Sequence, residues 1–421
     1  MEPTAGPTQP SGDRLALLYS LSQTFNSSLD LGEVLDRVMD EVIAATRAER
    51  GFVMLREADG QLTFRVARGM DQRTIEDPAF QISRSVVEGV ARDGQPVLTS
   101  DAQIDDRFSM RQSVAILGLR SILCVPLRIK DKVLGVIYVD NRFHASLFGA
   151  ADLELLTAIA ATAAIAIENA RLYQVAVEKG RLERELQVAR EVQAGLLPAA
   201  TPQVPGWDFA ALWRPAREVA GDYYDFIHFV DGQIGLVIAD VSDKGMPAAL
   251  FMALTRSIVR ASVAQMASSA QGIAYANRLI CADASEGMFV TLFYARLDPV
   301  ARTLTYVNAG HNPPLLYRAG EGRLEQLERT GMVLGVEEDM PFEQRQVRLG
   351  PGDFVLLYTD GVTEAIDTAE QEFGVVRLEQ VVLERSRRPA AEIVAAVVQA
   401  VARFSPAPFD DTTVLVAKCL T

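Results

Sequence analysis

Cysteine, histidine and positive charge are all scarce in this sequence. The three cysteines, Cys124, Cys281 and Cys419, lie far apart and have neither the paired spacing of a zinc site nor that of a disulfide framework. Lys and Arg number 41 against 55 Asp and Glu, which gives a formal net charge of −14 at pH 7. Proteins that bind nucleic acid through its phosphates carry clustered positive charge. We therefore expect a reduced, cytoplasmic protein with no nucleic acid partner.

Long hydrophobic runs are absent as well. The longest nearly pure apolar run, Leu155 to Ile167, is too short and too rich in alanine for a membrane-spanning helix. The N-terminus lacks a basic region followed by an apolar core, which is the pattern of an export signal. These two absences predict a soluble protein that is neither exported nor inserted in a membrane.

The length and composition are those of a folded protein with several domains. The chain has 421 residues, more than one hydrophobic core usually serves, so two or three domains are expected. Hydrophobic residues make up 49% and charged residues 23%, which excludes a fibrous or disordered chain. Residues 1–12 are rich in Pro, Gly and Thr and nearly devoid of apolar side chains, which predicts a disordered tail.

Residues 13–172 have the pattern of one α+β domain. Apolar residues recur at helical spacing in its first thirty residues, and several segments within 51–140 are rich in β-branched and aromatic residues. Two of these segments, Ser121–Arg128 and Val133–Asp140, are close enough in sequence to form a hairpin. A long helix is expected to begin after Asp152 and to continue beyond the domain.

Residues 173–200 form the charged continuation of this helix and are predicted to link two domains. Leu182, Leu186 and Leu196 fall at the spacing of a coiled-coil seam, with Gln193 interrupting it. A parallel homodimer through this seam and a single solvated helix packed on its own domain fit the pattern equally well. Three prolines end the helix and mark the domain boundary: Pro198, Pro202 and Pro205.

Residues 201–421 combine many strand candidates with a few helices, among them Pro247–Ala264 and Ala390–Phe404, which predicts a second α+β domain. Aspartates stand beside apolar strand candidates at four places, and a strand that stops at a carboxylate fixes its oxygens in space. Each motif alone is also typical of a turn, so convergence of the four places is the hypothesis. The aspartates are Asp222, Asp240, Asp360 and the pair Asp410–Asp411.

Converging carboxylates would repel one another and would have raised pKa values unless cations lay between them. Ligand sets made only of oxygen favour Mg²⁺ or Mn²⁺ over zinc or copper. Two such ions, about 3.5–4 Å apart, hold a bridging water for in-line attack on phosphorus. Other phosphate chemistries are excluded, because the sequence has neither a Cys-x₅-Arg loop nor a P-loop.

Six stretches in the second half occur in the order typical of one family. Residues 186–421 thereby resemble the SpoIIE-type branch of the metal-dependent Ser/Thr protein phosphatases, which act in bacterial sigma-factor partner switching. The stretches are Gln193–Pro198, Gly221–Asp225, Asp240–Gly245, Phe293–Ala295 through Asn308–Pro314, Tyr358–Gly361 and Asp410–Thr413.

This resemblance implies a PPM-type α/β/β/α sandwich and two divalent ions, Mn²⁺ or Mg²⁺, with no further cofactor. Within the pair of adjacent aspartates it favours Asp410 over Asp411 as a ligand. The catalytic, metal-binding carboxylates that it implies are Asp222, Asp240, Asp360 and Asp410, with the Val241 carbonyl and Asp411 as further metal ligands.

The chain departs from the family pattern at two positions near these residues. Ala220 and Asp243 stand where glycine is frequent, and Asp243 adds a negative charge. His311 has two interpretations, a general acid or a ring that braces its own turn by hydrogen bonds. Lys244 likewise either neutralises a substrate phosphate or is simply solvated.

The N-terminal half, about residues 13–172, resembles a GAF domain, an antiparallel sheet with flanking helices. The motifs that carry the resemblance are Gly118–Ile122, Val125–Leu127, Gly135–Val139 and Phe148-x₃-Asp152. The cyclic-nucleotide signature of some members is incomplete, because Arg142 stands where Lys is usual and Leu153 where Glu is usual. The ligand, a small molecule or a protein, is therefore open.

Together these patterns predict a sensor joined to an effector enzyme. The GAF domain receives a signal, the helix transmits it, and the second domain hydrolyses phosphoserine or phosphothreonine on a protein. The family resemblance implies an anti-sigma-factor antagonist as substrate. A parallel homodimer through Leu182, Leu186 and Leu196 would provide the two-state element that transmits the signal. The alternative is a catalytically silent phosphatase fold that serves as a scaffold for signalling partners.

Overall fold

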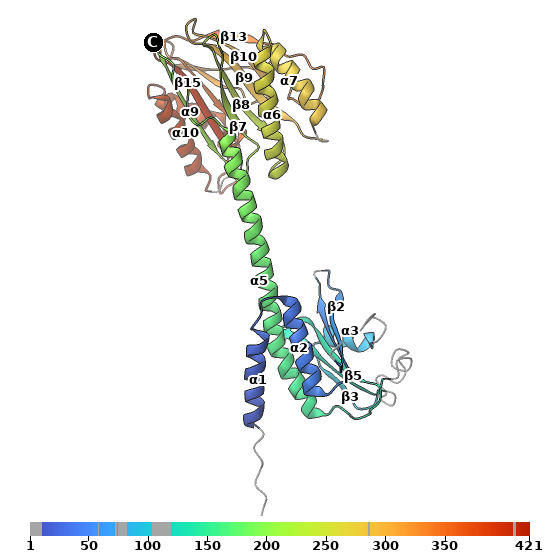
Figure 1. The fold of residues 1–421 in the computed structure, drawn as a ribbon. Helices are drawn as coiled ribbons and strands as arrows, with labels where there is room; N and C mark the ends of the chain where they lie inside the picture. The colour runs from blue at the N-terminus through green and yellow to red at the C-terminus, as the bar shows by residue number, and fades with distance from the viewer. Residues whose placement is uncertain are drawn as a thin grey trace, which may run out of the picture. The chain divides into compact units, whose positions relative to one another are not determined.

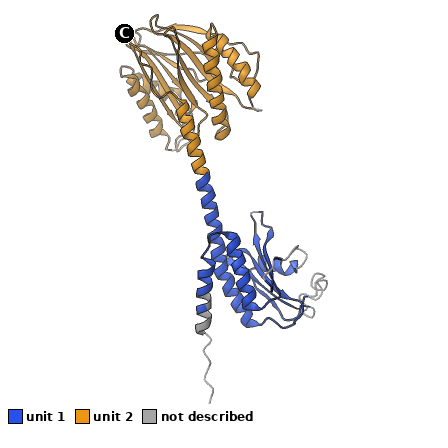
Figure 2. Ribbon diagram, in the orientation of Figure 1, with its two compact units in different colours: residues 1–181 blue, residues 182–421 orange. Residues whose placement is uncertain are grey.

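The computed structural model describes residues 11–57, 59–71, 74, 82–102, 119–284, 287–406 and 410–421. The chain divides into two compact units, residues 1–181 and 182–421 (Figure 2), which are described separately below. Most of the expected tail, residues 1–10, and Gly118 of the GAF motif lie outside the described residues. Ser11 and Gly12, which were expected in the tail, begin the first turn of a helix. This first turn carries no apolar residue, so the sequence shows no periodic pattern there.

Among the described residues of unit 1, five strands form an antiparallel sheet in the order β2-β1-β5-β4-β3. The predicted hairpin is present, because β4 and β5 pair antiparallel from Ser121–Asn141 to Ile129–Lys132. The strands are β1 (Arg50–Arg56), β2 (Leu62–Gly69), β3 (Val97–Thr99), β4 (Ser121–Ile129) and β5 (Lys132–Asn141).

Helices cover both faces of this sheet (Figure 1). Helices α2 and α5 bury their apolar side chains on one face, and α3 packs on the other through Val86, Val87 and Val90. Asp30 caps the N-terminus of α2 by accepting a hydrogen bond from the Glu33 N–H at 3.0 Å. The helices are α1 (Ser11–Phe25), α2 (Leu31–Thr46), α3 (Arg84–Asp93) and α5 (Ala150–Leu196).

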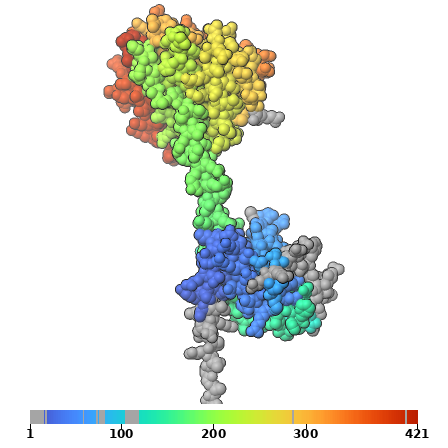
Figure 3. All heavy atoms as spheres, viewed as in Figure 1, coloured from blue at the N-terminus to red at the C-terminus, as the bar shows by residue number. Residues whose placement is uncertain are grey.

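Helix α5 is continuous for 47 residues and belongs in part to each unit. Its N-terminal part packs in the core of unit 1 through Leu156, Ile159 and Ala163. By length and composition alone it contains a window apolar enough to cross a membrane, and 39% of that window is buried inside the protein. Further along, the side chains lie on the molecular surface (Figure 3), with Leu182 54% exposed.

Unit 2 is an α/β/β/α sandwich, as the family resemblance implied. Its described strands form two sheets, ordered β13-β10-β9-β8-β7 and β12-β11-β14-β15-β6. Phe226, Ile238 and Leu415 are among the residues that fill the core between the sheets. The strands are β6 (Trp207–Arg214), β7 (Tyr223–His228), β8 (Ile234–Val241), β9 (Val290–Asp298), β10 (Thr303–Ala309), β11 (Leu315–Arg318), β12 (Arg323–Gln326), β13 (Arg345–Arg348), β14 (Phe354–Tyr358) and β15 (Thr412–Cys419).

The outer layers of the sandwich are pairs of helices. Helices α6 (Met246–Gln265) and α7 (Ser269–Asp283) cover the β7–β8–β9 sheet, and α9 (Gly374–Arg385) and α10 (Ala390–Phe404) cover the β14–β15–β6 sheet. A one-turn helix, α8 (Asp360–Thr363), follows β14 directly.

Candidate metal centre

The five sequence-predicted aspartates lie where four strands begin or end. Asp222 immediately precedes β7 and Asp240 lies near the end of β8, its antiparallel neighbour. In the other sheet, Asp360 opens α8 directly after β14, while Asp410 and Asp411 precede β15, which pairs with β14. Each sheet therefore supplies carboxylates from a pair of adjacent strands.

Asp222 is the most deeply buried member of the cluster, with 1% of its surface exposed. Its Oδ2 accepts hydrogen bonds from the hydroxyls of Thr359 and Thr413, each at 2.7 Å. Burial raises its pKa well above the usual value, and the charges of Asp240 and Asp411 raise it further. The carboxyl group is thus oriented by two hydroxyls but has negative neighbours.

Asp240 lies between carboxylates from both sheets. Burial raises its pKa to about 8, and the negative charges of Asp360 and Asp410 add to the increase, against a hydrogen bond with Asp222 that lowers it. Burial likewise raises the pKa of Asp360 to about 6, with Glu364 and Asp410 contributing. The structure therefore places these side chains within electrostatic reach of one another.

The two adjacent aspartates before β15 have different surroundings. Asp411 accepts backbone N–H bonds from Ala216 and Gly221 on its two oxygens, both at 2.8 Å. Asp410 forms an ion pair instead, with its Oδ2 2.7 Å from Lys244 Nζ. Asp411 thus fixes the loop before Asp222, whereas Asp410 faces a cation.

The described side chains contain no closed group of three or more His, Cys, Asp or Glu residues placed to hold a metal ion. Their contacts account for this, because Asp222 is turned to two threonines and Asp410 to Lys244. The donor set nevertheless fits hard divalent ions, since it consists of carboxylates whose pKa values are raised by burial and by one another's negative charge. The Lys244 ammonium already supplies a positive charge at Asp410.

The backbone around the cluster is close-packed at two glycines. A Cβ on Gly221 would lie 2.9 Å from the carbonyl oxygen of Val241, so this carbonyl lies beside the segment that carries Asp222. A Cβ on Gly361 would lie 2.0 Å from the Asp411 carbonyl oxygen, a distance that excludes any side chain. Glycine at both places lets the strand ends approach.

His311 is buried and braces the core. Its Nε2 lies 3.2 Å from the Tyr358 carbonyl oxygen and its Nδ1 lies 2.8 Å from the Thr291 hydroxyl. Because the carbonyl only accepts, Nε2 carries the proton and Nδ1 accepts from Thr291. Burial lowers the pKa of His311 to about 4, so the ring is neutral. These contacts match the bracing interpretation and not the general acid.

Sequence reasoning missed the polar residues that orient the cluster. Thr359 and Thr413 were quoted only as parts of motifs, and Trp213 was not considered, although its Nε1 donates to the Asp222 carbonyl oxygen at 2.9 Å. Gln193 was noted only as an interruption of the seam. The only sequence signal for these orienting residues was a position next to a candidate aspartate. Among them only Thr359 has such a position, beside Asp360.

Comparison with known families assigns both halves of the chain. Residues 230–420 match the family model described as stage II sporulation protein E (SpoIIE), and residues 30–167 match the GAF domain model. The chain joins a GAF domain to a SpoIIE-type domain. The matched SpoIIE-type segment contains Asp240, Asp360 and Asp410, whereas Asp222 precedes it.

Curated relatives are similar over nearly half of the chain. The phosphoserine phosphatase RsbU of Bacillus subtilis (strain 168) is 34% identical over 183 residues, which cover 44% of this chain and 54% of RsbU. Protein IcfG of Synechocystis sp. is 31% identical over 229 residues, 48% of this chain and 36% of IcfG. The chain thus spans about half or less of the lengths of these relatives. Among solved structures, the SiaA-PP2C domain of Pseudomonas aeruginosa shares the fold, with a TM-score of 0.53 and 21% identity over 58% of this chain and 99% of that domain.

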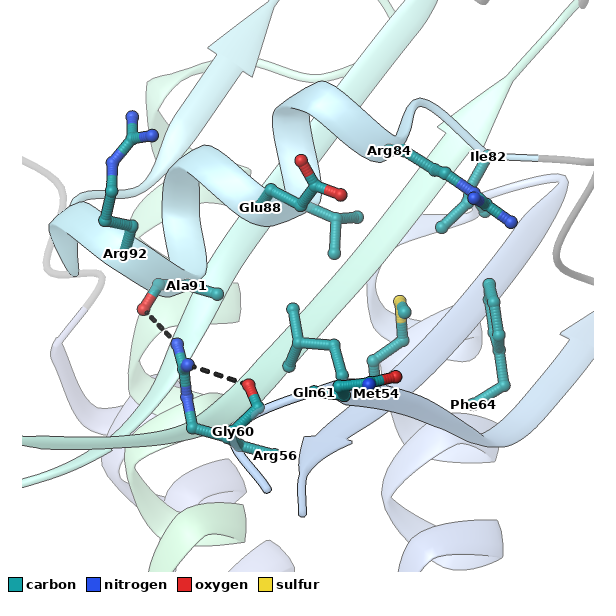
Figure 4. A pocket seen from close by; sticks show the side chains of 12 residues that line it. Met54, Arg56, Gly60, Gln61, Phe64, Ile82, Arg84, Glu88, Ala91 and Arg92 are labelled. Atoms are coloured by element: carbon teal, nitrogen blue, oxygen red, sulfur yellow. Dashed lines mark hydrogen bonds between the residues drawn. The ribbon is translucent and has the colours of Figure 1, made fainter. Parts of the chain in front are cut away.

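The GAF domain contains a cavity of about 540 Å³ between the β1–β2 hairpin and α3 (Figure 4). Arg56 closes one side, because its guanidinium donates to the carbonyl oxygens of Gly60 at 3.1 Å and Ala91 at 3.0 Å. Apolar and charged side chains share the remaining wall, and its members include Met54, Phe64, Ile82, Arg84, Glu88 and Arg92.

Proposed function

We propose that this protein is a metal-dependent phosphoprotein phosphatase, specific for phosphoserine or phosphothreonine, whose activity is regulated through its GAF domain. The observation that carries the proposal is the position of Asp240 among carboxylates of both sheets, with its pKa raised to about 8. Like-charged groups are retained in a buried site when a cation compensates them. The likeness to a relative named as a phosphoserine phosphatase supports the same reaction.

We propose that Asp222, Asp240, Asp360 and Asp410, together with the Val241 carbonyl, hold two divalent ions, Mn²⁺ or Mg²⁺. When bound, such a pair lowers the pKa of a water and neutralises charge on the phosphoryl oxygens. Thr359 and Thr413 keep one oxygen of Asp222 fixed, which leaves the other directed away from them. Asp411 holds the loop before Asp222 through two N–H groups and ranks behind Asp410 as a ligand.

The regulatory parts of the proposal concern the remaining segments. Residues 13–172 serve as the sensor, and the cavity between the β1–β2 hairpin and α3 is the site for a small ligand. Residues 173–200 link the domains, and residues 201–421 form the phosphatase. The substrate is a phosphorylated anti-sigma-factor antagonist of the partner-switching type. The protein acts in the cytoplasm as a homodimer through the exposed face of α5 that includes Leu182.

The decisive experiment compares the full chain with its Asp240→Asn variant on a phosphoserine peptide and on p-nitrophenyl phosphate, with Mn²⁺ and after chelation. The wild type should hydrolyse both substrates only with the metal, and Asp240→Asn should lose at least about a hundredfold in kcat/KM, because it removes a central ligand. Asp231→Asn, at an exposed aspartate paired with Arg296, is the matched control and should retain activity. Absent turnover in the wild type would leave the scaffold interpretation instead, which the four acidic ligand positions do not favour. Metal-independent turnover would contradict the proposed metal centre.

A further inference from the structure

Lys244 brings a positive charge to the aspartate cluster. Its Nζ lies 2.7 Å from Asp410 Oδ2, and the two side chains are 39% and 27% exposed. Burial raises the pKa values of Asp360 and Glu364, and the charge of Lys244 counteracts this increase at both. One ammonium group thus acts on three carboxylates, and two of these are proposed metal ligands.

Both side-chain oxygens of Asp410 have partners. Oδ1 accepts a hydrogen bond from the Asp411 N–H at 2.9 Å, and Oδ2 faces the ammonium of Lys244. Asp222 differs, because a single one of its oxygens receives both threonine hydroxyls. A divalent ion that binds Asp410 through Oδ2 therefore has to take the place of the ammonium group or lie beside a like charge.

The turn between β8 and α6 holds the backbone of Lys244. Asp243 and Gly245, on either side of it, have φ values of 78° and 84°. The Ser242 N–H donates to the Phe289 carbonyl oxygen at 2.9 Å, and the Ser242 hydroxyl accepts from the Phe289 N–H at 2.8 Å. Lys244 thus lies between a residue that is fixed by two hydrogen bonds and the first turn of α6. Only its side chain has to move when the ion pair with Asp410 breaks.

We infer that Lys244 is an internal counter-ion of the metal centre, which neutralises Asp410 in the metal-free protein and competes with a divalent ion for this carboxylate. The inference rests on the proposed function and deepens it by naming a residue that limits the metal affinity. Apparent affinity falls when the binding-competent state is only part of the population, and here that state is the one with the ion pair broken. Neither sequence interpretation of Lys244, phosphate neutralisation or simple solvation, includes this role.

The test measures binding of Mn²⁺ alone to the full chain by isothermal titration calorimetry, without substrate. Lys244→Met should bind Mn²⁺ at least about tenfold more tightly than the wild type, because no ion pair has to break and no like charge lies nearby. Lys244→Arg keeps the charge and can form paired hydrogen bonds to a carboxylate, so it should bind no more tightly than the wild type. A merely structural role of Lys244 gives the opposite sign, because a disturbed turn beside Asp240 weakens metal binding.

Arg323→Met is the matched control for the loss of one positive charge. Arg323 lies on β12, is 56% exposed, and pairs with Glu321 and, at 2.7 Å, with Glu325. This variant should bind Mn²⁺ with wild-type affinity. If it binds as tightly as Lys244→Met, the effect belongs to the net charge of the protein and the inference is overturned.

Thermal unfolding provides a second readout that does not involve turnover. Without metal, Lys244→Met should melt at a lower temperature than the wild type, because Asp410 loses its counter-charge. The same concentration of Mn²⁺ should raise the melting temperature of the variant by more than that of the wild type, because tighter binding stabilises the folded state more. An equal or smaller rise contradicts the inference.

The outcomes separate the inference from the proposed function. If Lys244→Met does not fold, as circular dichroism will reveal, Lys244→Gln makes the same comparison. Wild-type or weaker affinity in the folded variant without the charge overturns the inference and leaves the proposed function intact. If neither the wild type nor this variant binds Mn²⁺, the proposed function is overturned and the inference with it.

Discussion

Each unit holds an aspartate near the end of a strand, Asp140 fully buried and Asp240 partly buried, but the units differ in where the opposite charge comes from. Asp140 in β5 is fully buried and accepts hydrogen bonds from the Arg50 guanidinium at 2.8 and 2.7 Å. Burial raises the pKa of Asp140 to about 6, and Arg50 limits the increase. Asp240 has a pKa of about 8, because Asp360 and Asp410 add to the effect of burial. In unit 1 the positive charge that compensates the aspartate thus belongs to a side chain of the protein. In unit 2 part of the compensating positive charge has to come from outside the chain.

The largest effect that tests this comparison is expected in unit 1. Asp140→Ala should lower its free energy of unfolding by about 3–5 kcal/mol, because both hydrogen bonds of the buried Arg50 guanidinium to Asp140 are lost. Urea denaturation of the full chain in the presence of a chelator measures this change.

Asp222→Asn is the matched variant in unit 2. It should leave the stability of the metal-free protein unchanged or raise it, because it removes one of several like charges while its amide oxygen still accepts from Thr359 and Thr413. A loss as large as that of Asp140→Ala would show that the cluster is compensated within the chain.

The pH dependence should have opposite signs at two buried groups, His311 in unit 2 and Asp140 in unit 1. The pKa of His311 is lowered to about 4, so its contribution to stability is present above pH 6.5 and is lost as the pH falls toward 4, by up to about 3 kcal/mol. The pKa of Asp140 is raised to about 6, so its contribution is present below about pH 4 and is lost as the pH rises toward 6.

Calorimetric melting of the full chain between pH 4 and 7, with a chelator present, measures both dependences. His311→Asn should remove the contribution of His311, so that the unit 2 transition is less sensitive to acid than in the wild type, whatever the variant does to the absolute melting temperature. An unchanged slope in this variant would assign the acid sensitivity to other groups.

The smallest effect is expected at Asp243, beside the cluster. This residue has a φ of 78°, in the region that favours glycine. Asp243→Gly should stabilise the metal-free protein by roughly 0.5–1 kcal/mol, because it relieves the backbone and removes a negative charge. Chemical denaturation measures the change, and a destabilised variant would mean that the hydrogen bond from the Lys244 N–H to Asp243 outweighs the strain.

Local pattern predicted much of the fold. Helix α10 has the bounds expected from its apolar spacing, Ala390–Phe404, and α6 extends one residue beyond each expected end. The same kind of reasoning gave no role to Asp225, which lies in the same motif as Asp222. Asp225 proves to be an ion-pair partner of Arg256 and Arg260 on α6, because its strand position turns it toward that helix.

Hydrogen bonds between residues that are distant in the chain could not be predicted from the sequence. Thr359 and Thr413 lie 137 and 191 residues from Asp222, and no spacing rule relates them to it. Gln193 stood out in the sequence only as a polar interruption of the apolar seam of α5. Its partner could not be predicted, because it is the backbone carbonyl group of Ala220, and every residue has such a group. Aspartates at strand ends could be identified from the sequence. The side chains that orient these aspartates by hydrogen bonds could not, because they are set by which strands become neighbours in the fold.

The pairing of β15 with both β6 and β14 has a consequence for synthesis of the protein. Strand β6 has no partner in the sheet until β15 has left the ribosome, and Asp410 and Asp411 immediately precede β15. A nascent chain halted before residue 410 would hold Asp222, Asp240 and Asp360 beside an unfinished sheet. The aspartate cluster is therefore completed only after the segment that precedes β15 has been synthesised.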